Sequence, residues 1–194
     1  TAPTWNASLP QWECEGPIPK EDVMHWLRSL AMLGLMVPLV GACDDDDSSG
    51  PATEFVATLS GSEEVPPVTT TATGSAVFSI SGDQITYTVT VANVENAVVS
   101  HIHIAAPGVN GPVRLNLCGT GDPLPACTSG TGVLATGANN VTVGTPAITF
   151  DSLVSAIRAG NTYVNVHTDN GVEPPNTGQG DMASGEIRGQ IEPE

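Results

Sequence analysis

Three histidines are the residues of this sequence whose type and spacing best suit a chemical site. One residue separates His101 from His103, and His167 lies in a second segment with the same alternation of polar and apolar residues. Because successive side chains of a β-strand point to opposite faces, Ile102 facing the core places His101 and His103 on the outer face. Three neutral imidazoles on one face suit copper or zinc.

The same alternation adds four polar side chains to the face that carries the histidines: Tyr163, Asn165, Glu186 and Arg188. Two interpretations of this polar patch remain open. In one, His101, His103 and His167 ligate a transition metal ion. In the other, the histidines hydrogen-bond to neighbouring side chains and serve packing, with Arg188 paired to Glu186.

Other patterns for chemistry are weak. The sequence has no Gly-x-Ser-x-Gly nucleophile motif and, after Cys43, no lysine for a phosphate-binding loop. Glu63 and Glu64 stand beside Val65 and two prolines, which predicts a solvated strand end rather than a carboxylate pair. Three more acidic residues offer calcium ligands in a long loop, Asp169, Glu173 and Asp181, but without an EF-hand spacing. We therefore expect a binding or structural module rather than an enzyme, the alternative being a copper-dependent redox protein.

The N-terminal part carries an export pattern. An apolar run from Leu30 to Val40 follows Arg28 and ends in Gly-Ala-Cys at Cys43, which resembles the lipobox of a bacterial lipoprotein signal peptide. We expect residues 1–23 to lie upstream of the true translation start. Residues 24–42 should then be the signal peptide, 43–51 an acidic tether and 52–194 the folded domain. Cys43 would then be lipidated and anchor the protein to a membrane of the bacterial cell envelope. An ordinary secretory signal or a retained anchor is the alternative.

The charge of the expected mature chain limits its partners. From Cys43 onward, three arginines stand against seventeen aspartates and glutamates, which gives −14. Such a surface repels nucleic acid and attracts cations and basic partners. We expect no nucleic-acid binding, and an extracytoplasmic protein or polysaccharide as partner.

Two cysteines remain for pairing once Cys43 is lipidated and Cys14 lies upstream of the start. Cys118 and Cys127 are nine residues apart across a Gly/Pro-rich loop. In an oxidising compartment such a pair most simply forms a disulfide.

Period-two alternation runs through the chain after Ala52 and predicts strands bounded by turn residues. The expected strands are 54–59, 76–80, 84–91, 98–105, 113–117, 141–150, 162–167 and 185–191. One short helix is expected over 153–158, capped by Asp151 or Ser152 and ended by Gly160. About eight short strands with turns between them indicate an antiparallel β-sandwich or barrel.

Four motifs, in this order, resemble the chordin-type (CHRD) domain: residues 59–67, 101–113 with its His-x-His and Asn-Gly-Pro-Val, 156–168 and 185–191. The resemblance covers about 53–192. It implies an immunoglobulin-like Greek-key β-sandwich, found in bacterial exported proteins and in animal chordin, and it implies no settled activity. The loops 118–127 and 169–183 are longer than the connections usual in that family.

Overall fold

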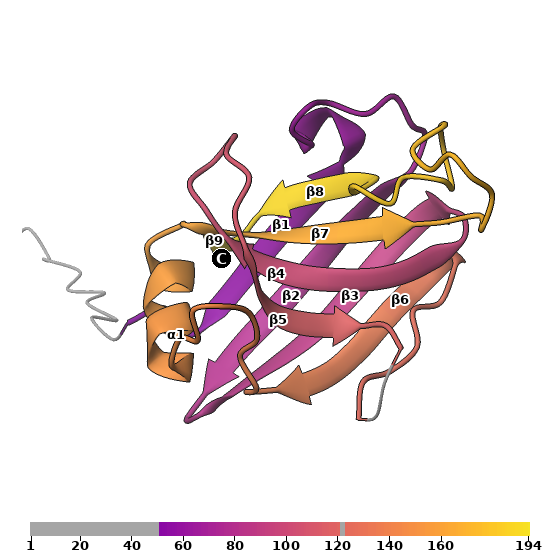
Figure 1. Cartoon of the computed structure of the whole chain (residues 1–194). Helices are drawn as coiled ribbons and strands as arrows, with labels where there is room; N and C mark the ends of the chain where they lie inside the picture. The colour runs from indigo at the N-terminus through magenta and orange to yellow at the C-terminus, as the bar shows by residue number, and fades with distance from the viewer. Residues whose placement is uncertain (1–50, 121–122) are drawn as a thin grey trace, which may run out of the picture. The chain divides into compact units, whose positions relative to one another are not determined.

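A single antiparallel sheet forms the framework of this protein. The structure, a computed structural model, describes residues 51–120 and 123–194. Its strands follow one another in the order β5-β4-β7-β8-β1-β2-β3-β6. The sheet curls until its edge strands β5 and β6 approach each other, so the fold is a nearly closed barrel (Figure 1). The expected all-β class with one short helix is confirmed, and of the two architectures left open the chain adopts the barrel.

The elements have the following bounds. The strands are β1 Glu54–Ser60, β2 Thr73–Ser81, β3 Gln84–Val94, β4 Ala97–Ile104, β5 Val113–Cys118, β6 Gly130–Asn139, β7 Thr162–Thr168, β8 Ile187–Gln190 and β9 Glu192–Pro193. The 3-10 turn η2 covers Gly61–Glu63, helix α1 covers Phe150–Arg158, and β9 pairs with β1. Within the described residues, no helix has the length and hydrophobicity that crossing a bilayer requires.

The core fills the barrel and follows the period of two along each strand. On β3, Ile85, Tyr87, Val89 and Val91 are all at most 4% exposed, and the residues between them face outward. Fully burying one aliphatic side chain of this size stabilises a fold by roughly 1.5–3 kcal/mol. On β3 the alternation that the sequence predicts therefore fixes which face carries the polar side chains.

One predicted strand is wrong. The segment 141–150 is mostly loop, with an isolated bridge at Thr142, because Gly144 and Pro146 interrupt it. The strand that completes the barrel is β6 instead, and it pairs with β3. Its sequence shows no clean alternation, since it holds three glycines and its register shifts at an irregularity next to Val89.

The helix begins earlier than predicted. Helix α1 starts at Phe150, and its cap is Thr149, whose side chain accepts a hydrogen bond from the Ser152 amide. A threonine at this position satisfies one of the free amides of the first turn. Asp151 lies inside the first turn, where a negative charge favours the positive end of the helix dipole.

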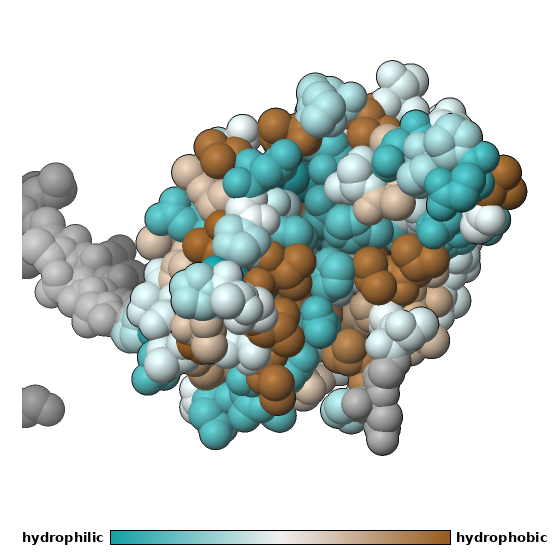
Figure 2. Space-filling model, viewed as in Figure 1, coloured by the Kyte–Doolittle hydropathy of each residue, from teal (hydrophilic) through white to brown (hydrophobic). Residues whose placement is uncertain are grey.

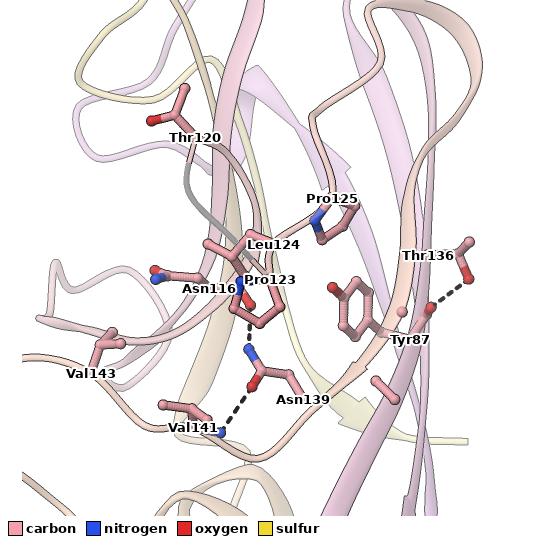
Figure 3. Close-up of a pocket in the computed structure, with 12 residues that line it drawn as sticks. Tyr87, Asn116, Thr120, Pro123, Leu124, Pro125, Thr136, Asn139, Val141 and Val143 are labelled. Atoms are coloured by element: carbon pink, nitrogen blue, oxygen red, sulfur yellow. Dashed lines mark hydrogen bonds between the residues drawn. The ribbon is translucent and has the colours of Figure 1, made fainter.

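The seam between β5 and β6 is closed by side chains rather than by a ladder. The Tyr87 hydroxyl donates to the Leu117 carbonyl at 2.6 Å, and the Asn139 amide donates to the Asn116 carbonyl at 3.0 Å. Figure 3 shows the Asn139 bond at the side of a pocket of about 580 Å³. The pocket lies at the seam, and none of the histidines lines it.

Cys118 and Cys127 are joined by a disulfide, with their Cα atoms 5.1 Å apart. Replacing both by serine should lower the free energy of unfolding by roughly 2–3 kcal/mol, the value expected for so short a loop. Urea denaturation of the variant and the parent measures the difference. Thiol labelling of the unfolded, unreduced protein should leave both positions unmodified, and two labelled cysteines there would contradict the pairing.

Candidate metal centre

Strand pairing brings the three histidines together on the outer face of the sheet. In the β4–β7 pair, His101 lies opposite Asn165, His103 opposite Tyr163, and His167 opposite Val99. Ile102 is fully buried in the barrel, so its two neighbours point outward as expected. His167 is then the diagonal neighbour of His101 across the pair. Strands β4, β7 and β8 face the reader in Figure 1, and Figure 2 shows hydrophilic residues gathered over them.

The rings converge with one nitrogen each facing the cluster. One ring nitrogen of each histidine lies within 4.8 Å of the others. The ring centroids of His101 and His167 are 5.2 Å apart, and those of His101 and His103 are 5.8 Å apart. Zinc binds imidazole nitrogen at about 2.0–2.1 Å, so the three nitrogens would have to move closer together to bind one ion.

Backbone carbonyls fix the orientation of two of the rings. Nδ1 of His103 donates to the Gly111 carbonyl, and Nδ1 of His167 donates to the Ala183 carbonyl, both at 2.9 Å. A carbonyl can only accept, so Nδ1 carries the proton and Nε2 keeps its lone pair. Histidines that ligate metals have this arrangement, in which the second nitrogen is held by an outer partner.

The nitrogens that face one another have no partner in the protein. Nδ1 of His101, Nε2 of His103 and Nε2 of His167 are buried and make no hydrogen bond. A buried polar atom without a partner costs free energy, about 1–3 kcal/mol for each group. A metal ion bound by these nitrogens would remove this cost.

The environment keeps the imidazoles neutral. Burial, together with the neighbouring His167 and His103, lowers the pKa of His101 to about 4. Burial also lowers the pKa values of His103 and His167, although their carbonyl partners act in the opposite direction. Neutral imidazole is the form that ligates a metal, so protons compete with metal only in acid.

The loop after β4 closes tightly over His103. A Cβ at Gly111 would lie 1.9 Å from the Ile104 carbonyl oxygen, so only glycine brings its own carbonyl to His103 at this point. Tyr163 stacks on the His103 ring with centroids 4.7 Å apart, and the Arg188 guanidinium lies 3.4 Å from the centroid of the Tyr163 ring. Arg188 also donates to Val109 and Asn110 of the same loop.

The side chains of the polar patch are buried. Its four members are at most 5% exposed: Tyr163, Asn165, Glu186 and Arg188. Arg188 is not paired with Glu186 either. The Glu186 carboxylate accepts from Thr70, Thr168 and the Gly180 amide, which ties the segments before β2 and before β8 together.

The comparison with protein-family models decides the family. The CHRD domain model matches residues 55–191, from the start of β1 to the end of β8. The chain belongs to the CHRD family. No curated protein and no solved structure matches it. All three histidines and all four residues of the polar patch lie inside the matched segment of the CHRD domain.

Glu64 is a site residue of the CHRD domain that the sequence did not reveal. The prediction of a solvated strand end holds for Glu63, which is exposed, and is wrong for Glu64, which is 5% exposed. Oε2 of Glu64 accepts from the Asn165 side-chain amide at 3.3 Å, and Oε1 has no partner. Burial raises the pKa of Glu64 to about 7, although the Arg188 charge acts to lower it. Glu64 directly follows the 3-10 turn η2 and belongs to no strand, so the alternation of apolar residues gives no sign that it is buried.

The calcium hypothesis for the long loop of the CHRD domain is not supported. Asp181 accepts hydrogen bonds from the Thr177 amide and hydroxyl, and Asp169 accepts from the Gly171 amide. These carboxylates stabilise the loop itself. Within residues 51–120 and 123–194, the histidines form the only group of three metal-binding side chains.

Proposed function

We propose that this CHRD domain is an exported module that binds one copper or zinc ion through His101, His103 and His167. The observation that carries the proposal is the set of three buried imidazole nitrogens that face one another without a hydrogen-bond partner. Imidazole suits both ions, and three protein ligands leave a fourth position for water or a further ligand. The proposal thus combines the binding module and the histidine metal site that the sequence analysis treated as alternatives.

Each residue around the cluster has a role in this proposal. The carbonyls of Gly111 and Ala183 orient two rings so that both offer Nε2. Tyr163 covers one face of His103, and Arg188 holds Tyr163 and the 109–110 segment in place. A bound copper ion would supply one-electron redox chemistry, whereas zinc would supply Lewis acidity or structure.

A titration tests the metal proposal. Protein purified without added metal is stripped with a chelator and titrated with Cu²⁺ or Zn²⁺ by calorimetry at neutral pH. We expect saturable binding close to one equivalent, and elemental analysis before stripping should find the same ion. Absence of saturable binding for both ions would contradict the proposal.

We further propose that the domain is tethered to a membrane of the bacterial cell envelope through Cys43. The support is the apolar run that ends in Gly-Ala-Cys, followed by four aspartates that suit a solvated tether. These residues lie outside those that the structure describes. An acylated tether would hold the metal centre outside the cytoplasm, where the Cys118–Cys127 disulfide can persist.

The mature protein should therefore begin at acylated Cys43. Intact mass of protein from the membrane fraction should equal the chain from Cys43 plus lipid, and Cys43→Ser should abolish lipidation. A mass that still includes Trp26, or a Cys43→Ser protein that fractionates and migrates like the parent, would overturn the tether.

A further inference from the structure

The chain contains two Asn-Gly pairs, and the fold gives them different surroundings. The pair Asn110-Gly111 belongs to the loop that closes over His103. The pair Asn170-Gly171 belongs to the loop after β7. An asparagine that precedes glycine can lose ammonia when the glycine nitrogen attacks the side-chain carboxamide carbon, because no Cβ on the glycine hinders the approach. The contacts around each pair decide whether the folded chain permits this reaction.

The pair in the loop after β7 is open to solvent. Asn170 and Gly171 are both exposed. Gly171 has a φ of +74°, and a Cβ built on it would have no atom of a non-adjacent residue within 4 Å. No packing contact therefore hinders the closure of a ring between the two residues.

Hydrogen bonds place a proton acceptor at the attacking nitrogen of this pair and a donor at the carbonyl that it attacks. The Gly171 amide donates to Oδ1 of Asp169, and the Val172 amide donates to Oδ1 of Asn170, both at 2.7 Å. A carboxylate bonded to the amide hydrogen can take this proton as the nitrogen attacks. A backbone amide that donates to the carboxamide oxygen stabilises the negative charge that develops there.

The carboxamide of Asn110, in contrast, is held at both ends. Its Nδ2 donates to the Val65 carbonyl at 2.7 Å, and its Oδ1 accepts from Arg188 at 3.1 Å. The Gly111 amide donates to the Tyr163 hydroxyl at 3.1 Å. The carboxamide carbon cannot turn toward the glycine nitrogen unless these bonds break.

We propose that Asn170 is a site of spontaneous deamidation in the folded protein and that Asn110 is protected from the same reaction. The Gly171 nitrogen forms a bond to the Asn170 side-chain carbon, and the carbon–nitrogen bond of the carboxamide breaks. The proton of Gly171 passes by way of Asp169 to the leaving ammonia. Water then opens the cyclic imide at either carbonyl, so the position becomes aspartate or isoaspartate. Each event replaces a neutral side chain with a carboxylate and requires no metal.

The test incubates the folded, full-length protein at pH 8 and follows both asparagines by peptide mass spectrometry. The peptide that contains Asn170 should gain one mass unit at least tenfold faster than the peptide that contains Asn110, with isoaspartate among its products. In urea neither pair keeps its folded contacts. Unfolding should therefore raise the rate at Asn110 and should not raise the rate at Asn170.

A pair of variants tests the proton acceptor. Asp169→Asn should slow the reaction at Asn170 at least threefold, because it removes the carboxylate that is bonded to the Gly171 amide. Glu173→Gln removes an exposed carboxylate from the same loop and should leave the rate unchanged. Equal rates at the two asparagines in the folded protein, a faster reaction at Asn170 after unfolding, or an unchanged rate in Asp169→Asn would overturn the proposal.

Discussion

Replacing His103 with alanine should abolish the binding of copper or zinc and the stabilisation that binding brings. His103 supplies the unpartnered Nε2 and is the most buried of the three imidazoles, at 8% exposure. With metal at 100 times the dissociation constant, the parent protein should gain about 2.7 kcal/mol, and the variant should gain nothing. Calorimetric titration and melting curves with and without metal measure both effects.

The comparison must use the increment that metal adds to each protein, because loss of the Tyr163 stack lowers the stability of the variant by itself. Glu63→Ala serves as the control and should keep the full increment, since Glu63 is exposed. A His103→Ala protein that still shows the metal-dependent shift would rule out the histidine site.

Because burial lowers the pKa of His101 to about 4, the parent should retain metal below pH 6.

Replacing Glu64 with glutamine should change how stability depends on pH. Burial raises the pKa of Glu64 in the folded chain from 4.5 to about 7, so the folded state holds this proton more tightly than the unfolded state. The stabilisation by protonated Glu64 is complete below pH 4.5 and is lost as the pH rises through 7. Relative to the parent, Glu64→Gln should therefore gain about 3 kcal/mol between pH 4 and pH 8.

Urea denaturation of both proteins across this pH range provides the measurement. Taking the difference at each pH cancels the titration of the three histidines, which both proteins share. Glu63→Gln should follow the parent curve at every pH. Parallel curves for Glu64→Gln and the parent would show that Glu64 titrates normally in the folded protein.

Strand alternation predicted which side chains of β4 and β7 face outward, including the three histidines, because it acts locally. In residues 101–104 and 162–167 the apolar positions recur every second residue, which places Ile102 inside and the histidines outside without further knowledge of the fold. That β4 and β7 are neighbours is a property of the topology, and only the structure supplies it. From the sequence, the convergence of the three rings could only be a hypothesis. In the structure, the pairing of β4 with β7 brings the rings together.

The loops could not be predicted in the same way. Residues 61–72, 105–112 and 169–186 contain no repeating apolar pattern, yet they bury Glu64, Tyr163 and Arg188. Their positions depend on hydrogen bonds between distant segments, such as those from Thr70 and Thr168 to Glu186. Strand β6 was missed for a related reason, since an edge strand rich in glycine buries few side chains and shows little alternation.

The seam between β5 and β6 also bears on how copies of this domain behave when they are crowded. These are the two ends of the strand order, so they hold the principal free edges of the sheet. The edges face each other across the Asn139 bond, and the Thr128 amide, just beyond the disulfide, donates to Leu134 of β6. Free edges invite the addition of a strand from another molecule. A sheet that turns its edges toward each other offers little template for aggregation, even where many copies are concentrated on one surface.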